Sequence, residues 1–251
     1  MKRVVVVLAM LVLLVISGGS AQEPQVSIRY YGQSFFLVTA PDGTRVALDP
    51  YGQIGYPLPT VSGDVVLITH EHGDHNNAGL VQGARRVLRG LTADRAGWNQ
   101  IYEQIGSVTV KAIASFHDNE GGTTPRGLNT IFVVETGGLR IVQMGDIGQA
   151  SLTNGQIQAI GSVDVLMIPV GGAPFTTGAA EATAITAQLR PRIVIPMHYK
   201  TAARPDWPGA DEQAFLAGKT NVVRTGNMLT LSTSRLPAST QIVVMEWRQE
   251  P

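Results

Sequence analysis

Short apolar runs separated by turn residues recur along the chain and predict many β-strands. Residues 64–69 form one nearly unbroken apolar run, as expected of a strand that is covered on both faces. The Pro-Asp-Gly turn at residues 41–43 and the Gly-Gly pair at residues 137–138 each separate two runs and predict antiparallel pairs. The predicted strands are residues 26–31, 34–39, 44–48, 64–69, 84–88, 107–114, 130–136, 139–144, 163–168, 192–197, 221–225, 228–232 and 241–247.

Helical patterns are fewer and shorter. Residues 179–189 are rich in alanine and stop before Pro191, which cannot continue a helix. Residues 211–217 form a second, shorter segment that ends at Gly218. A third helix is predicted after Thr92, a good N-cap, from residues at helical spacing, Trp98, Ile101, Tyr102 and Ile105. The pattern as a whole predicts an α/β fold with two sheets and helices outside them.

The N-terminus has the features of a secretory signal peptide. Two basic residues precede an unbroken apolar run over residues 4–16, and small residues follow at Gly19 and Ala21. We therefore expect residues 1–21 to be removed and residues 22–251 to form one domain in the periplasm or outside the cell. If the segment is not cleaved, it would anchor the chain in a membrane, and no other membrane contact is expected.

Composition narrows the class of protein. Hydrophobic residues make up 44% and charged residues 15% of the 251 residues, which argues against disorder. The formal net charge is zero, so no basic surface for a nucleic-acid partner is indicated. The chain has no cysteine, which excludes disulfides and thiolate metal ligands.

Three of the five histidines lie within six residues, directly after the predicted strand at residues 64–69. His70 and His72 are two residues apart and can converge on one ion if the backbone turns. Asp74 and His75 would then face a neighbouring position. A solvated loop is the alternative, but three imidazoles packed so closely favour a metal site.

Three more residues of the metal-ligand type follow predicted strands. They are His117, Asp146 and His198. Each alone could be an ordinary structural residue. Strand ends at one edge of a sheet can meet in space, however, and functional groups often gather on such loops. Together with the histidine-rich run, they use every histidine of the chain and predict a metal centre.

The donor chemistry restricts the metal. Imidazole and carboxylate without thiolate suit zinc, manganese or iron. Five histidines and two aspartates are too many for one tetrahedral ion, and they suit two ions about 3.5–4 Å apart. We therefore expect two divalent ions, with zinc as the first choice and manganese or iron as alternatives.

The order of these motifs resembles the metallo-β-lactamase superfamily. The matching motifs are His70-Glu71-His72-Gly73-Asp74-His75, His117, Gly145-Asp146 and His198, and phrases such as Ile195-Pro196-Met197-His198-Tyr199 look most like a broad bacterial branch of Zn-dependent hydrolases. That branch is similar to L-ascorbate-6-phosphate lactonase and N-acyl-phosphatidylethanolamine phospholipase D. The resemblance implies an αββα sandwich of two mixed sheets with helices on the outer faces, and a hydrolase domain over residues 22–251.

The resemblance also implies a role for each ligand. His70, His72 and His117 would bind the first ion, while Asp74, His75 and His198 would bind the second, with Asp146 between the two. Asp49 lies where relatives carry an acidic residue that supports the ligands, although a simple turn before Pro50 explains it equally well.

The implied activity is hydrolysis of a phosphoester or of a lactone or other ester, in a small-molecule or lipid-like substrate. A hydroxide formed from a water that bridges the two ions would attack, and Asp74 would orient the hydroxide and could accept the proton that the water loses. Candidate substrate contacts flank the ligand loops and are Arg126, Asn129, Tyr199 and Lys200. A redox enzyme of the same fold and a non-catalytic metal-binding protein remain as alternatives, although flavodiiron relatives usually have Glu at the position of His72.

Overall fold

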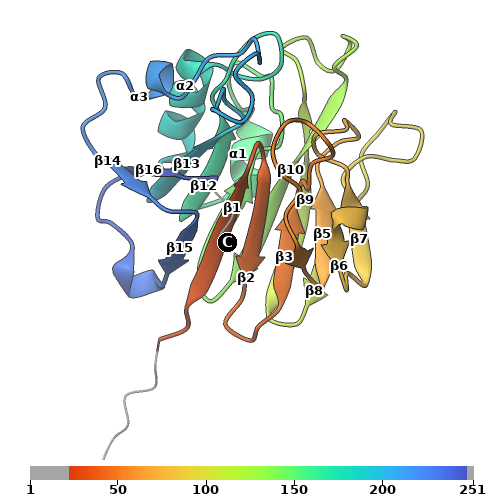
Figure 1. Ribbon diagram of the computed structural model, residues 1–251, viewed down its shortest axis with the longest axis vertical. Helices are drawn as coiled ribbons and strands as arrows, with labels where there is room; N and C mark the ends of the chain where they lie inside the picture. The colour runs from red at the N-terminus through yellow and green to blue at the C-terminus, as the bar shows by residue number, and fades with distance from the viewer. Residues whose placement is uncertain (1–22, 248–251) are drawn as a thin grey trace, which may run out of the picture.

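A computed structural model describes residues 23–247 as two β-sheets that face each other, with helices packed on one of them (Figure 1). The predicted signal peptide, residues 1–21, lies outside the described residues. Within the described part of the chain, no helix is long and apolar enough to cross a membrane. The two mixed sheets agree with the predicted α/β fold class.

The first sheet has six strands in the order β15-β1-β2-β3-β5-β7. Strands β15, β1, β2 and β3 pair antiparallel, whereas β3, β5 and β7 pair parallel. Strands β4 and β6 form a separate parallel pair. The bounds are β1 Val26–Gly32, β2 Phe35–Thr39, β3 Arg45–Leu48, β4 Val61–Ser62, β5 Val65–Ile68, β6 Val81–Gln82, β7 Arg86–Arg89 and β15 Met228–Leu231.

The second sheet has eight strands in the order β14-β16-β13-β12-β11-β10-β9-β8. Strands β8 to β11 form an antiparallel meander, and β11, β12, β13, β16 and β14 pair parallel. The bounds are β8 Tyr102–Ile105, β9 Val108–Phe116, β10 Leu128–Thr136, β11 Leu139–Gln143, β12 Val165–Pro169, β13 Ile193–Met197, β14 Val222–Thr225 and β16 Gln241–Met245.

The main core lies between the sheets. Alternate residues of β1, including Val26, Ile28 and Tyr30, point into it and meet Val110 and Phe132 from the second sheet. On the other face of the second sheet, apolar side chains pack against the three α-helices of the described chain. Those helices are α1 Asn154–Ile160, α2 Ala179–Leu189 and α3 Gln213–Leu216, and two short 3₁₀ turns are η1 Ala78–Leu80 and η2 Thr233–Arg235.

Loops rather than α-helices cover the outer face of the first sheet within the described residues. Phe35 and Val66 from the strands pack there against Tyr51, Tyr56 and Leu80 from the connecting segments. The rings of Phe35 and Tyr51 meet edge to face at 5.6 Å. The expected helical layer on both outer faces is therefore present as α-helix on the second sheet only.

The helix predicted from the spacing of residues 98–105 is wrong. Residues Tyr102–Ile105 form β8, which pairs antiparallel with β9 through the turn at Gly106. Thr92 instead closes a local turn, since its backbone N–H donates to the carbonyl of Gly97. Ile101 and Ile105 are four residues apart, a spacing that fits either a helical turn or alternate positions of a strand.

One helix was not predicted from the sequence. Helix α1 begins after Thr153, whose hydroxyl accepts a hydrogen bond from the backbone N–H of Gln156, while the Gln156 side chain accepts one from the N–H of Thr153. This reciprocal capping box satisfies two backbone donors that would otherwise be free. The helix is only two turns long, so its apolar periodicity is weak, and the Thr-x-x-Gln signal was the one available clue.

Candidate metal centre

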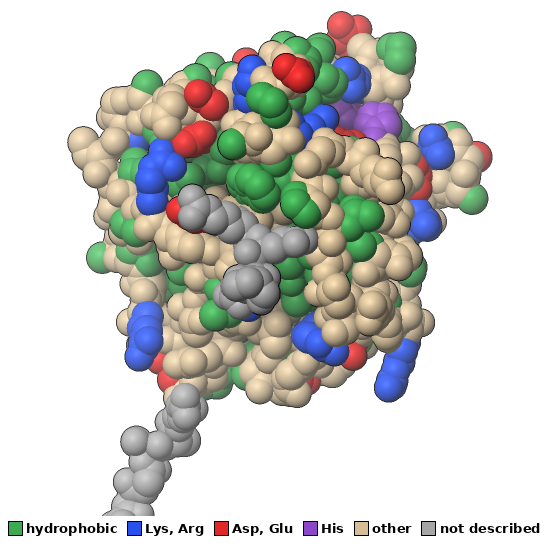
Figure 2. All heavy atoms as spheres, viewed as in Figure 1, with side chains coloured by type: hydrophobic (Ala, Val, Ile, Leu, Met, Phe, Trp, Pro, Cys, Tyr) green, Lys and Arg blue, Asp and Glu red, His purple; other side chains and the backbone are tan. Residues whose placement is uncertain are grey.

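The predicted metal ligands lie on loops at the same edge of the two sheets. The run from His70 to His75 follows β5, His117 follows β9, Asp146 follows β11 and His198 follows β13. Because these strands all end at one edge, residues separated by up to 128 positions meet there. Histidine side chains reach the surface at the upper right of the molecule, with basic side chains around them (Figure 2).

The seven side chains form two groups. Within each group, the ligand atoms lie within 4.8 Å of one another. The first group is His70, His72 and His117, and the second is Asp74, His75, Asp146 and His198. In the first group, Nε2 of His70 lies 3.0 Å from Nδ1 of His72. The division is the same as the one implied by the family resemblance, with Asp146 placed in the second group.

Asp146 joins the two groups. Its Oδ2 atom lies 3.1 Å from Nε2 of both His75 and His198, and 3.4 Å from Nε2 of His117 in the first group. The same oxygen is 3.8 Å from Nε2 of His70. The Asp146 side chain is only 3% exposed, so this carboxylate is enclosed by histidines rather than by water.

Unpartnered polar atoms show that these residues fit a metal. Among the described residues, buried atoms without a hydrogen-bond partner include Nε2 of His75, His117 and His198 and Oδ1 of Asp146. Buried polar atoms normally have a partner, because leaving one unsatisfied costs about 1–3 kcal/mol. Imidazole nitrogens and carboxylate oxygens converging on the same space are the donor set for zinc, manganese or iron.

Burial and nearby charges shift the pKa values of His70 in the first group and His198 in the second group in opposite directions. Burial and the nearby His75 lower the pKa of His70, and burial also lowers the pKa of His72. Burial would lower the pKa of His198 as well, but Asp146 and Asp74 outweigh it and raise this pKa to about 9. His70 and His72 are therefore neutral at neutral pH, whereas His198 holds a proton that a metal has to displace.

Asp49 contacts the side of the His75 ring that points away from the other candidate ligands. Its Oδ2 atom lies 3.0 Å from Nδ1 of His75, opposite the Nε2 atom that faces the metal group. Thr69 fixes this carboxylate, since its backbone N–H donates to Oδ1 at 2.8 Å and its hydroxyl donates to Oδ2 at 2.7 Å. A carboxylate behind a ligating imidazole sets the orientation and tautomer of the ring. Asp49 is completely buried, so it is more than a surface turn before Pro50.

Gln33 is a site residue that sequence reasoning missed. It lies between β1 and β2, and its Nε2 atom donates a 2.8 Å hydrogen bond to Oδ2 of Asp74. Its Oε1 atom accepts a 2.9 Å hydrogen bond from Arg204, and its carbonyl accepts one from the N–H of His198. A glutamine is not a typical metal ligand, so the sequence carried no signal beyond its place in a tight turn between two strands.

Asn129 has a structural role in place of the predicted substrate contact. The side chain is completely buried, and its Nδ2 atom donates to Oγ of Ser115 and to the carbonyl of Met144, both at 2.8 Å. Its Oδ1 atom accepts a 3.0 Å hydrogen bond from the backbone N–H of Asp146. Because both ends of the amide are used inside the protein, Asn129 positions the Asp146 loop and does not face a substrate.

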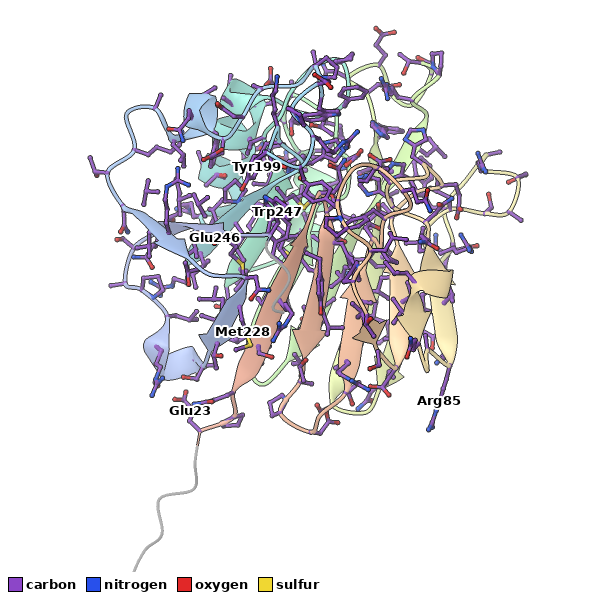
Figure 3. All side chains as sticks on the ribbon, viewed as in Figure 1. Glu23, Arg85, Tyr199, Met228, Glu246 and Trp247 are labelled. Atoms are coloured by element: carbon purple, nitrogen blue, oxygen red, sulfur yellow. The ribbon has the colours of Figure 1, made fainter. Side chains whose placement is uncertain are left out.

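The other three predicted substrate contacts do not converge. Arg126 lines a cavity together with His70 and His72. Tyr199 and Lys200 line a different and larger cavity, of about 540 Å³, which also has Trp247 in its wall (Figure 3). The two cavities share no lining residue. Arg126 is therefore the one of the four that the structure places beside the histidines in a cavity.

A family comparison decides the identity of the fold. The model of the beta-lactamase superfamily domain matches residues 27–198, which span all seven predicted ligands. The chain belongs to the metallo-β-lactamase superfamily. Curated relatives in this superfamily include a UPF0173 metal-dependent hydrolase from Anaeromyxobacter sp. (strain K), which is 30% identical over 80% of this chain and 85% of its own length. Another, from Thermus thermophilus, is 32% identical over 70% of this chain and 84% of its own length.

Solved structures agree with this assignment. A protein from Thermotoga maritima, described as a candidate Zn-dependent hydrolase of the metallo-β-lactamase superfamily, is 30% identical and superposes with a TM-score of 0.69 over 88% of this chain and 99% of its own. Igni18, a metallo hydrolase from Ignicoccus hospitalis, is 25% identical with a TM-score of 0.59, over 83% of this chain and 99% of its own. This metallo-β-lactamase fold protein is a metal-dependent hydrolase.

Proposed function

We propose that this hydrolase is dinuclear and cleaves a phosphoester, a lactone or another ester in a small-molecule or lipid-like substrate. The observation that supports two ions is the position of Asp146. Its Oδ2 atom lies 3.4 Å from His117 of the first group and 3.1 Å from His75 and His198 of the second. A carboxylate between two groups of imidazoles suits a pair of ions that lie close together.

Each of the two groups of residues would hold one ion. His70, His72 and His117 would hold one, Asp74, His75 and His198 would hold the other, and Asp146 would contact both. When bound, two such ions supply Lewis acidity, which lowers the pKa of water toward neutrality and polarises the group to be cleaved. Zinc is the ion we propose first, because the donors are imidazole and carboxylate.

Asp74 is the proposed catalytic residue. Its side chain is 24% exposed, whereas Asp146 is 3% and Asp49 is 0% exposed, so of these three carboxylates it is the one that can exchange a proton with solvent or substrate. Burial raises the pKa of Asp74, but His75 and His198 outweigh burial and hold it below its ordinary value. The carboxylate is therefore ionised at neutral pH and can accept the proton of an attacking water.

The experiment is metal analysis of the purified protein combined with a screen of esters, lactones and phosphodiesters. We expect close to two equivalents of metal per chain and turnover of at least one substrate class. Asp74→Asn should lower kcat by about 100-fold or more at saturating metal, because it removes the proton acceptor while keeping the side-chain size.

Asp206→Asn is the matched control, since Asp206 is an exposed aspartate outside both metal groups. This variant should keep full activity. One equivalent of metal would contradict the dinuclear proposal. An active Asp74→Asn variant that still holds two equivalents of metal would contradict the catalytic role assigned to Asp74 and leave the dinuclear proposal intact.

A further inference from the structure

A small cavity beside the first group of histidines contains two arginines. It has a volume of about 150 Å³, and its lining includes His70, His72, Arg95 and Arg126. Leu91 and Leu128 add apolar wall. Cavities for whole drug-sized ligands are usually about 300–1,000 Å³, so this one suits a single substituent of a larger substrate.

The charges in this cavity are positive and uncompensated. Its one acidic residue is Glu71, and both carboxylate oxygens of Glu71 accept hydrogen bonds from Arg89 at 2.7 Å. Neither Arg95 nor Arg126 forms a salt bridge with any carboxylate in residues 23–247. The Arg126 guanidinium lies 4.8 Å from the centre of the Phe175 ring, a contact that holds its plane without neutralising its charge.

The loop that carries Arg126 is fixed before any ligand binds. The Asp118 carboxylate accepts hydrogen bonds from the N–H groups of Glu120, Gly122 and Thr124 and from the Thr124 hydroxyl. The Thr124 hydroxyl oxygen in turn accepts one from the backbone N–H of Arg126. This network sets the position of the Arg126 backbone, so little backbone entropy is lost when a ligand is bound.

Arg95 is also held in a defined turn. Its φ of 60° lies in the left-handed region, which a residue with a Cβ rarely adopts. Its backbone N–H donates to the carbonyl of Thr92, and the Thr92 hydroxyl donates to the Asp94 carboxylate within the same turn. Strained backbone of this kind persists where the surroundings impose it, and it is often found at ligand sites.

We propose that Arg95 and Arg126 form a subsite for an anionic group of the substrate, a carboxylate or a phosphate, next to the bond that is cleaved. The guanidinium group binds both anions through paired N–H donors. The apolar walls from Leu91 and Leu128 would contact the carbon atoms that carry the anion. The proposal rests on the proposed hydrolytic function, and it adds that the natural substrate carries a negative charge apart from its scissile group.

The first experiment measures binding to the zinc-loaded full chain by calorimetry. The probes are phenyl phosphate, benzoate and the neutral benzamide. We expect the Arg95→Gln/Arg126→Gln double variant to bind the better of the two anions about 10- to 100-fold more weakly, with benzamide unaffected. The anion that loses more affinity identifies the subsite as one for phosphate or for carboxylate. Thermal unfolding checks that the variant is folded.

Arg85→Gln is the matched control. Arg85 is exposed and points away from the molecule at the end opposite the histidines (Figures 2 and 3), so the substitution removes one positive charge far from the cavity, against two in the double variant. The subsite is disproved if the double variant binds both anions as tightly as the unsubstituted chain. It is also disproved if the unsubstituted chain binds neither anion, or if benzamide is weakened to the same extent.

The second experiment separates the subsite from the proposed function. It compares turnover of 4-acetoxybenzoate and of its neutral methyl ester by the unsubstituted chain and the double variant. We expect kcat/KM to fall about 10- to 100-fold for the charged ester only. Equal losses for both esters would overturn the subsite while leaving hydrolysis in place. If no ester, lactone or phosphodiester is cleaved but the anions still bind through the arginines, the proposed function fails and the binding site stands.

Discussion

The side-chain amide of Gln33 donates a 2.8 Å hydrogen bond to Oδ2 of Asp74, 41 residues further along the chain. Gln33 is 1% exposed and has a φ of 54°, and its carbonyl accepts hydrogen bonds from the Tyr30 hydroxyl and from the N–H of His198. The turn between β1 and β2 therefore holds the proposed proton acceptor and one metal ligand at the same time. We assign Gln33 as a positioning residue.

Replacing Gln33 by Leu should lower kcat by about 10-fold with little change in KM. The substitution removes the donor that orients Asp74 but no metal ligand, so the metal content should stay the same. Steady-state kinetics and metal analysis give the two readouts. Gln104→Leu, in the exposed part of β8, is the matched control and should leave both unchanged. A loss of metal equal to the loss of activity would show that Gln33 acts on metal binding instead.

Replacing Asp49 by Asn should weaken metal binding by about 10- to 100-fold, because the carboxylate behind His75 loses its charge. The amide has the same size, and Thr69 can still donate to its oxygen, so the fold should survive. Competition with a chelator measures the affinity. Asp206→Asn should leave the metal affinity unchanged. An unchanged affinity in Asp49→Asn would contradict the role of Asp49 in orienting His75.

The two candidate metal-binding groups were predictable from the sequence because their residues follow apolar strands and are of types with few other roles in that pattern. His70 to His75 form one contiguous motif, and the later ligands follow it in a fixed order. The residues that hold the ligands were harder to find. The contact of Gln33 with Asp74 depends on how two separate loops fold together, and neither residue type indicates this contact in the sequence.

The wrongly predicted helix and the wrongly predicted role of Asn129 have a common physical cause, the packing of neighbouring strands. The apolar residues before β9 are spaced so that a helix and a strand fit equally well, and the pairing of β8 with β9 decides between them. Asn129 looked available because it precedes an apolar strand near the ligand loops. Its burial and its bond to the Asp146 N–H come from the packing of β10 against β11, which the sequence alone does not show.

Replacing Gly145 by Ala should destabilise the protein by about 1–3 kcal/mol. Gly145 has a φ of 56°, and an added Cβ would lie 2.3 Å from Oδ1 of Asn129 and 2.8 Å from Cβ of Thr69. Gly43→Ala is an informative control, because Gly43 also has a positive φ, 87°, but nothing lies within 4 Å of the added Cβ. Chemical denaturation should show the larger loss at Gly145. Equal losses would mean that only the backbone conformation matters there.

Metal binding at the second group should release protons and strengthen as the pH rises. Burial lowers the pKa of His198, but Asp146 and Asp74 outweigh burial and raise it to about 9. His198 is therefore protonated at neutral pH before a metal binds, and the metal has to displace that proton. From this residue alone, the apparent affinity should rise about tenfold per pH unit between about 7 and 9 and then level off.

The raised pKa of His198 makes the stability of the metal-free chain change with pH in the opposite direction to metal affinity. A raised pKa stabilises the folded chain below the unfolded value near 6.5, and this contribution is lost as the pH rises through about 9. His70 and His72 should behave differently, since burial lowers their pKa values and leaves them neutral. Calorimetric metal titrations in buffers of different ionisation enthalpy count the released protons. Because His198 is protonated and His72 is neutral near pH 7, His198→Gln should reduce that count, whereas His72→Gln should not.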